Sequence, residues 1–447
     1  MEKNYVNITD DDYKSLDIDP ASGAFKRYLK AGLLEMTDEK FVSDIQAFWS
    51  KHYNQKVDPV LNIAFMNLTG RKDTRVVPAY LMSSQIIPYF NDKQITVGYK
   101  DKNIYDALLK TPRSAETVLK RVRGKYFSSD NHHLSSKEAK QTLLESESDL
   151  IIKPSNTNNG IGIAKLVIRS GYLMRGEEAV TLSDLEETYG QNFIVQKAIK
   201  QHPLMAAPHP SSVNTLRMVT LRWKQEIIHL LTFARFGANN DVKDNAGGGG
   251  VCLGLTEDGK FLDIAMDEHA NTYTHHPTTN FCFKDLDSIP NFEEFKQFVI
   301  DAHAQILHHD FVSWDIAMDT DGKPVCIEAN FAGATWLYQL AAQKPMFGDL
   351  TEEILQKVSE ENGNQNYVSP KVKLKKQKRQ ITRYSNKIKE LENMLQEAEE
   401  NAKNLRLQNK RLRRQKKMIK NKYENLLQSK SWRYTSPFRT IVKTVKK

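Results

Sequence analysis

The chain has 447 residues, of which 40% are hydrophobic, so we expect two or three globular domains with buried cores. Residues 371–447 contain 25 Lys and Arg against 6 Asp and Glu, a net charge of +19, whereas residues 1–370 contain 39 against 49, a net charge of −10. The net negative charge of residues 1–370 argues against nucleic-acid binding by this part of the chain. No apolar run of about 18 residues offers a membrane span, and the polar first residues are unlike a signal peptide. The cytoplasm is therefore the expected compartment.

Cysteine and histidine spacing gives no metal-binding pattern. Cys252, Cys282 and Cys326 are widely spaced without a CxxC motif, so we expect neither a disulfide framework nor a zinc site. The three adjacent histidine pairs in the chain have no partner at i, i+4 and no cysteine nearby, so they carry little weight as metal ligands.

The first hundred residues predict a helical and mixed region, because apolar residues recur at helical spacing within 25–34 and 41–49. A helix over 101–110, with Asp101 as its N-cap, then opens the main domain. The expected divisions of the chain are an N-terminal region (1–100), two subdomains of one domain (101–200 and 201–360), a linker (361–371), a coiled coil (372–430) and a basic aromatic tail (431–447).

A loop of small polar residues, Pro154 to Gly162, lies between predicted strands at 149–153 and 161–168. Such a loop can offer backbone N–H groups to a phosphate, because its glycines have no Cβ to block a close approach. Lys153 ends the first strand and would point a cation at the same phosphate. The loop is not a Walker motif, since no GK[ST] follows. A polar hairpin loop without a ligand is the alternative.

Three more strands are predicted at 193–200, 216–223 and 226–236, the first leaving the core as a hinge. A bend at Lys224-Gln225 joins the other two, which carry several arginines. Four consecutive glycines, 247–250, then favour a mobile loop or a close approach to a ligand.

The stretch from Phe311 to Asn330 predicts two strands joined by a two-residue turn at Asp321-Gly322. Counting outward from that turn places Asp315 opposite Glu328. Because side chains alternate along a strand, these carboxylates share one face with Ser313 and Asn330. The other face should be a core face, with Trp314, Ile316 and Met318 opposite Ala329, Ile327 and Val325.

Two facing carboxylates with Cβ atoms roughly 5 Å apart should repel each other, and a bound cation would turn that repulsion into attraction. Carboxylates with an amide oxygen suit a hard ion such as Mg²⁺. The alternative is a surface hairpin whose acids face water. A slipped register or a bulge would also break the pairing.

The order of these parts resembles the ATP-grasp superfamily: a strand ending in lysine, a small polar loop, a strand with a hinge, a glycine loop, then Asp and Glu-x-Asn on a hairpin. More narrowly, residues 75–355 are similar to the sugar-transfer-associated ATP-grasp family, which is linked to bacterial cell-surface polysaccharide synthesis. The resemblance implies an α/β (α+β) fold whose two α+β subdomains grip ATP, here with a helical N-terminal region and a C-terminal coiled coil.

For nucleotide binding, the resemblance implies that Lys153 binds phosphate and that 156–162 forms a small lid loop. Gln196, Lys197 and Ile199 resemble the hinge that reads adenine, the latter two through backbone groups. The lid residues implied as contacts are Asn156, Asn159, Gly160 and Gly162. The segment after the hinge, KQHPLMAAPHP, lacks the acidic residue that contacts ribose in many members.

For the chemistry, Asp315, Glu328 and Asn330 resemble the magnesium ligands. Arg217 and Asn245 resemble contacts of the γ-phosphate or acyl phosphate. Lys102 lies in a DKN motif similar to one that opens the domain in the family. The resemblance implies ATP and Mg²⁺ as cofactors and a carboxylate–amine ligase that passes through an acylphosphate, with lids that exclude water. Its carboxylate and amine substrates would be small molecules or groups linked to a glycan.

Two alternatives to the ligase stay open. The first is a kinase-like phosphotransferase with the same fold. The second is a non-catalytic scaffold that senses nucleotide and associates through its coiled coil.

From Ile381 the tail predicts seven heptads, with apolar residues at alternating spacings of three and four. Asn409 falls at an a position, which favours one register in a parallel pair, so a homodimer is expected. The alternative is a single helix solvated by its charges.

After Ser429, three aromatic and six basic residues suit an anionic membrane surface. The segment SWRYTSPFR is also similar to one in bacterial surface-polysaccharide glycosyltransferases. Contact with the inner face of a membrane or with a glycosyltransferase is therefore a further expectation.

Overall fold

The computed structural model describes residues 13–109 except 15, then 113–157, 162–239, 248–364, 370–430 and 434. The chain divides into two compact units, residues 1–365 and 366–447. Within the described ranges, every helix is too short or too polar to cross a lipid bilayer.

The first sheet has eight antiparallel strands in the order β3-β2-β1-β8-β4-β5-β6-β7. Helices α9 and α10 bury their apolar residues in its core, and each begins with a capping box. The elements are β1 (Thr117–Val122), β2 (Lys125–Phe127), β3 (His133–Leu134), α9 (Ser136–Leu144), β4 (Leu150–Pro154), β5 (Ala164–Arg169), β6 (Tyr172–Arg175), β7 (Glu178–Ala179), α10 (Leu182–Tyr189) and β8 (Phe193–Lys197).

The helix expected at 101–110 is shorter than predicted. A 3₁₀ turn, η2 (Lys102–Ile104), and a short helix, α8 (Tyr105–Leu108), take its place. Asp101 does cap the turn, because its carboxylate accepts the N–H of Asn103 at 3.0 Å. The backbone N–H of Lys102 is bonded to Ser155 O at 2.8 Å, so the first turn is tied to the chain beyond β4.

The second sheet has seven antiparallel strands in the order β13-β12-β11-β10-β9-β14-β15. Helix α12 (Phe292–Ala304) contributes Phe295 and Val299 to the core on one face. The strands are β9 (Thr215–Trp223), β10 (Glu226–Phe236), β11 (Val251–Leu255), β12 (Phe261–Met266), β13 (Thr272–Tyr273), β14 (Phe311–Met318) and β15 (Pro324–Asn330), with the short elements α11 (Pro203–Ala206) and η4 (Phe283–Asp285) between them.

A bulge at Leu230 decides which face of the sheet later residues of β10 occupy. His229 pairs with Thr220, but Leu231 pairs with Val219, so one residue of β10 has no partner. One extra residue moves the following side chains to the opposite face of the strand. Arg235, which pairs with Thr215, therefore lies on the same face as Arg217.

The hairpin β14–β15 confirms the predicted pairing of Asp315 with Glu328 and of Ser313 with Asn330. The predicted two-residue turn is wrong. Of the two residues expected there, only Gly322 has a positive φ, at 74°. The carboxylate of Asp319 accepts the N–H groups of Asp321 and Lys323 and so closes a longer turn.

Between this turn and the carboxylates the observed register differs by one residue from the prediction. Ile316 pairs with Cys326 rather than Ile327, and Met318 pairs with Pro324 rather than Val325. A bulge at Ile327 restores the predicted register at Glu328. Trp314, Ile316 and Met318 do lie in the core, as expected.

The N-terminal region is helical, as its apolar spacing predicts. The side chains of Ser22 and Asp38 cap its first two described helices by accepting the N–H groups of Phe25 and Phe41. The elements are α2 (Gly23–Lys30), α3 (Glu39–Tyr53), α4 (Val60–Thr69), α5 (Ala79–Leu81), the π-helical turn η1 (Met82–Ile86), α6 (Ile87–Phe90) and α7 (Thr96–Tyr99).

These helices share one core with the second sheet. Trp49 and Phe65 belong to the same buried cluster as Leu221 of β9 and Phe233 of β10. The pairing of β9 with β14 places Leu221 on the same face as Arg217 and Asp315. The N-terminal region therefore covers one end of the sheet face that carries these charged residues at its other end.

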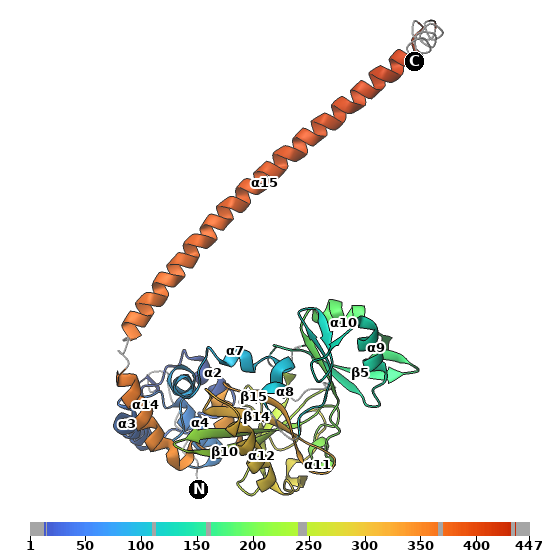
Figure 1. Ribbon diagram of the computed structural model, residues 1–447. Helices are drawn as coiled ribbons and strands as arrows, with labels where there is room; N and C mark the ends of the chain where they lie inside the picture. The colour runs from blue at the N-terminus through green and yellow to red at the C-terminus, as the bar shows by residue number, and fades with distance from the viewer. Residues whose placement is uncertain are drawn as a thin grey trace. The chain divides into compact units, whose positions relative to one another are not determined.

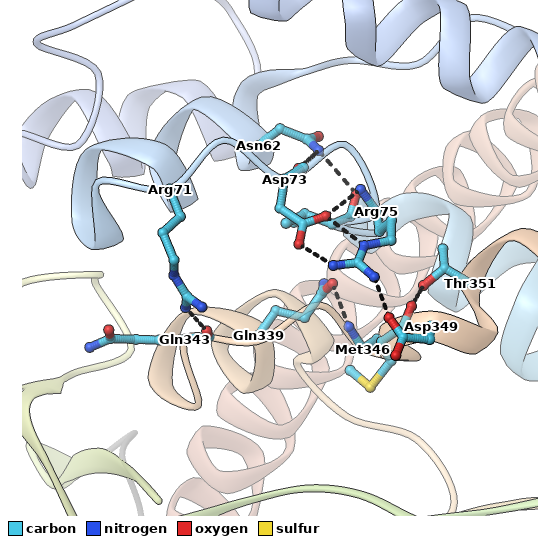
Figure 2. Close-up of polar contacts among 11 residues, drawn as sticks. Asn62, Arg71, Asp73, Arg75, Gln339, Gln343, Met346, Asp349 and Thr351 are labelled. Atoms are coloured by element: carbon cyan, nitrogen blue, oxygen red, sulfur yellow. Dashed lines mark hydrogen bonds and ion pairs between the residues drawn. The ribbon is translucent and has the colours of Figure 1, made fainter. Parts of the chain in front are cut away.

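Polar contacts hold the N-terminal region to the end of the domain, which is formed by α13 (Thr335–Ala341), η5 (Gly348–Leu350) and α14 (Thr351–Asn364) (Figure 2). Arg75 bridges Asp73 at 2.9 Å and Asp349 at 2.6 Å. The buried amide of Gln339 accepts the N–H of Val77 at 2.8 Å and donates to its carbonyl at 2.9 Å. Helix α13 is thus fixed against a segment some 260 positions earlier in the chain.

The second unit contains a single 59-residue helix, α15 (Pro370–Gln428), drawn in orange-red in Figure 1. Its continuity confirms the helix expected there, and self-association stays a prediction. The apolar a and d side chains that are more than half exposed in this unit are Tyr384, Ile388, Leu391, Leu395, Leu405, Leu412, Ile419, Tyr423 and Leu426. Residues 365–369 of the predicted linker and most of the tail (431–433 and 435–447) lie outside the described residues.

We predict that α15 dimerises the chain through this stripe. Leu405→Asp combined with Leu412→Asp places two charges at d positions and should give a monomer in light scattering. The matched control is Leu407→Asp with Met418→Asp, which adds the same charges at the equally exposed f and c positions. A dimer that survives the d-position changes, or a dimer of a chain ending at residue 364, would contradict this assignment.

Candidate active site

Asp315 is the centre of a buried charge cluster on β14. Arg217 of the neighbouring β9 binds both carboxylate oxygens, with Nε–Oδ1 at 2.5 Å and Nη2–Oδ2 at 3.1 Å. Arg235 adds a third contact from Nη1 to Oδ2 at 3.1 Å. Burial alone would raise the pKa of the Asp315 carboxyl, but the two guanidinium groups outweigh it and lower the pKa below its usual value.

Glu328, opposite Asp315, has a different set of cations. Lys102 Nζ lies 3.3 Å from Glu328 Oε1, and the buried Lys153 on β4 interacts with the same carboxylate. The expected repulsion between the two carboxylates is therefore compensated by one lysine from the turn η2, one lysine from the first sheet and two arginines from the second sheet. Electrostatic interactions within this cluster therefore connect the β14–β15 hairpin of the second sheet with Lys153 of the first sheet.

The oxygen donors on this face fit a magnesium ion. Asp315, Glu328 and Asn330 share one face of the hairpin, and Asn330 Nδ2 lies 3.3 Å from Asp315 Oδ2. Two carboxylates and an amide are hard oxygen ligands, too few to enclose an ion without water or phosphate, which is the usual situation for Mg²⁺. No group of three His, Cys, Asp or Glu side chains suited to a metal occurs in the described part of the chain.

Lys153 is 6% exposed at the end of β4, as predicted. Burial lowers the pKa of its ammonium group to about 8, although Glu328 acts in the opposite direction. Nearby, the hydroxyl of Ser155 is fully buried and has no hydrogen-bond partner among the described residues. A buried cation beside an unsatisfied hydroxyl fits an anionic ligand with several acceptor oxygens.

The loop after β4 is anchored by Lys102, whose Nζ donates to Thr157 O at 2.9 Å. Asn156 is exposed. Gly162 has φ +78°, and a Cβ there would lie 2.9 Å from Pro154 Cγ, so the loop returns close to its own start. Asn159 and Gly160 of this loop lie outside the described residues, as does Asn245 of the glycine-rich segment.

The predicted hinge follows β8. Gln196 is buried and its amide donates to Ala115 O at 3.0 Å. Lys197 pairs with Glu116 through its side chain at 2.6 Å and through its backbone N–H. The backbone N–H of Ile199 donates to no other group in the described part of the chain. A free N–H at this point is a donor suited to a nucleobase.

The family comparison decides the identity of this arrangement. A model of the family described as sugar-transfer associated ATP-grasp matches residues 81–355, well over half of the chain. The chain belongs to this family. Its mixed helix and sheet architecture with two antiparallel sheets is that of an ATP-grasp protein, and ATP is therefore its expected nucleotide.

Solved structures with similarity to this ATP-grasp chain include D-alanine–D-alanine ligase from Bacillus anthracis (13% identity, covering 59% of this chain and 69% of that one, TM-score 0.32). VanG D-Ala:D-Ser ligase from Enterococcus faecalis has 13% identity, 60% and 63% coverage and a TM-score of 0.36. An L-amino acid ligase from Bacillus licheniformis has 14% identity, 58% and 48% coverage and a TM-score of 0.30. These scores are too low to assign a reaction, and the chain spans less than two-thirds of the last two. A search of curated protein sequences gave no match.

Sequence reasoning missed two residues of this ATP-grasp site. Arg235 is placed beside Asp315 by the bulge at Leu230, and no feature of the sequence marks that bulge. Lys102 was noted for its DKN motif without a role, and the structure places its ammonium group between Glu328 and the lid loop. For Lys102, the DKN motif was the sequence feature that could have indicated its place near Glu328.

We predict that Lys153→Met weakens ATP binding at least tenfold while the fold is retained, because a buried ammonium contributes a charge-assisted bond to phosphate. A pKa of about 8 means that burying the charged group costs the folded protein on the order of 3 kcal/mol near neutral pH, so the variant should unfold at no lower temperature. Calorimetric titration and thermal unfolding measure both effects.

Lys140→Met on α9 is the matched control, since Lys140 is exposed and α9 carries none of the residues proposed for the site. ATP affinity of the native protein should also fall as the pH rises through about 8, where Lys153 loses its proton, and this fall should be absent in Lys153→Met. Unchanged affinity in Lys153→Met would remove the residue from the site.

Proposed function

We propose that this chain is an ATP- and Mg²⁺-dependent ligase that activates a carboxylate as an acylphosphate and transfers it to an amine or similar nucleophile. The observation that carries the proposal is the charge cluster, in which Lys102 of η2, Lys153 of β4, Arg217 of β9 and Arg235 of β10 surround the facing Asp315 and Glu328. Such a cluster is suited to exchange its carboxylate partners for phosphate oxygens.

The nucleotide would lie between the sheets. Lys153 and Lys102 would neutralise its phosphates, and the start of the lid loop would cover them. Gln196 and the backbone groups of Lys197 and Ile199 would contact adenine. The further lid contacts proposed are Asn156, Asn159, Gly160 and Gly162.

Asp315, Glu328 and Asn330 would hold Mg²⁺, which neutralises and orients the phosphates when bound. Arg217 would stabilise charge on the transferred phosphoryl group, and its contact with the proposed metal ligand Asp315 supports this role. Asn245 is proposed for the same role from the resemblance alone. Water exclusion by the loops at 156–162 and 244–250 would protect the acylphosphate from hydrolysis.

The proposed setting is bacterial cell-surface polysaccharide assembly in the cytoplasm, and the description of the family as sugar-transfer associated supports the link to sugar transfer. The substrates are then small-molecule or glycan-linked carboxylates and amines. A phosphotransferase with the same site would give a phosphorylated product in place of a ligated one. A nucleotide-sensing scaffold would bind ATP without turnover.

The test is capture of the acylphosphate. Full-length protein with ATP, Mg²⁺, hydroxylamine and a panel of carboxylic acids should release ADP and form a hydroxamate. Glu328→Gln should lower this rate at least roughly 100-fold, because it removes a charge from the proposed metal site. Asp321→Asn, the same type of change at the exposed turn of this hairpin, should leave it unchanged.

A stable phosphorylated acid without hydroxamate would favour the phosphotransferase, and ATP binding without ADP release would favour the scaffold. Full activity in Glu328→Gln would overturn the metal assignment.

The basic tail is proposed to bring the chain to the inner face of a membrane. Its six basic residues after Ser429 contribute about 1 kcal/mol each near an anionic surface. Full-length protein should sediment with anionic liposomes at low salt and be released by salt, because screening shortens the range of the attraction. Neutral liposomes and a chain ending at residue 429 are the controls. Failure to bind anionic liposomes would leave a protein partner, such as a glycosyltransferase, as the target of the tail.

A further inference from the structure

A pocket of about 390 Å³ opens beside the charge cluster. Arg217 and Arg235 line it from the second sheet, next to Asn330. Trp336 and Tyr338 of α13 line it from the helix side. The pocket thus begins where the phosphoryl-transfer chemistry is proposed and extends away from it along the same sheet face.

The N-terminal region contributes Arg27 of α2 to this pocket. The guanidinium carbon of Arg27 lies 4.3 Å from the centre of the Trp336 ring, a cation–π stack. Tyr28, the next residue, packs its ring edge against the same indole at 5.8 Å. The stacking holds the guanidinium plane in one orientation, and the guanidinium also donates to the Tyr28 hydroxyl. Because a guanidinium has five N–H donors in a planar fork, the others can still bind an anion.

Arg27 differs from the other arginines of the pocket in its charge partners. Arg217 and Arg235 both contact Asp315. No carboxylate in the described part of the chain lies within ion-pair distance of Arg27, although the side chain is partly buried. Glu268, the one carboxylate among the described lining residues, lies 3.7 Å from His269. The lining therefore carries three guanidinium groups against one carboxylate.

The two lining aromatics of α13 are held in place by their neighbours. Gln339, next in sequence to Tyr338, is clamped to Val77 by the two hydrogen bonds described above. Tyr338 receives a hydrogen bond from Arg217 Nη1 at 2.5 Å. A Cβ at Gly333 would come within 2.1 Å of the Tyr338 hydroxyl, so the pocket rim accepts only glycine there. A guanidinium stacked on this helix is therefore preorganised for a ligand.

We propose that this pocket binds the acid substrate and that Arg27 binds a second anionic group of that substrate, distinct from the carboxylate that reacts. The substrate class is then a small acid with a further carboxylate. The reacting end lies at Arg217 and Asn330, beside the proposed metal ligands. Arg27 is a specificity-determining residue supplied by the N-terminal region. This inference rests on the proposed function, since it deepens the assignment of the same site.

The test is calorimetric titration of full-length protein saturated with Mg²⁺ and a non-hydrolysable ATP analogue. The probes are glutarate and adipate, compared with pentanoate and hexanoate, which have the same chain lengths and one carboxylate fewer. The dicarboxylates should bind at least tenfold more tightly than their partners. Arg27→Met should reduce that ratio to below about twofold and leave the affinity for the nucleotide analogue unchanged.

Lys26→Met is the matched control, because Lys26 is the exposed neighbour of Arg27 on the same helix and does not line the pocket. Its dicarboxylate preference should equal that of the native protein. Arg27→Lys keeps the charge and loses the planar fork, so it should give an intermediate ratio.

Native protein that shows no dicarboxylate preference overturns the inference, as does a preference that survives Arg27→Met. Both results are distinguishable from failure of the proposed function, which would appear in the separate hydroxylamine assay as an absence of ADP release or of hydroxamate.

Discussion

The site depends on one buried carboxylate. Asp315 is buried on β14, the strand next to the edge of a seven-stranded sheet, where an unpaired charge would be strongly destabilising, and the guanidinium groups of Arg217 on β9 and Arg235 on β10 compensate it. Removal of either arginine would leave part of that charge uncompensated. The strand order β10-β9-β14-β15 is therefore constrained by electrostatics as well as by apolar packing, because this order brings Arg217, Asp315 and Glu328 into one cross-strand row, with Arg235 two positions along β10 from that row on the same face.

The arrangement of these charged residues on one face depends on two single-residue bulges. The same bulges limit how much of the site could be predicted from the sequence. Counting from the turn correctly paired Asp315 with Glu328, but the longer turn and the bulge at Ile327 offset each other, so the agreement depended on two compensating departures. In β10 the bulge at Leu230 has no such compensation, and Arg235 could not be assigned to the site face by alternation. Motif order identified the family and the lysine at the end of β4. The contribution of Arg27 required the tertiary structure, because nothing in α2 marks it.

Lysines from η2 and β4 and arginines from the second sheet converge on the same hairpin. Glu328 forms an ion pair with Lys102, and the ammonium group of Lys102 also donates a hydrogen bond to the carbonyl of Thr157 at the start of the lid loop. A phosphate or metal that changes the charge at Glu328 would thereby act on the lid through a single side chain. Local electrostatics at the hairpin and the position of the loop are coupled by this contact.

The sharing of one core by the N-terminal helices and the second sheet has a consequence for how this chain can be divided. The family match begins at residue 81, but the face of β9 and β10 that carries Leu221 and Phe233 is covered by residues such as Trp49 and Phe65 from before that point. A fragment cut at the homology boundary would expose a continuous apolar sheet face to solvent, and such faces promote aggregation. The unit of folding is therefore longer than the unit of sequence similarity, and expression of the catalytic part should begin ahead of α2.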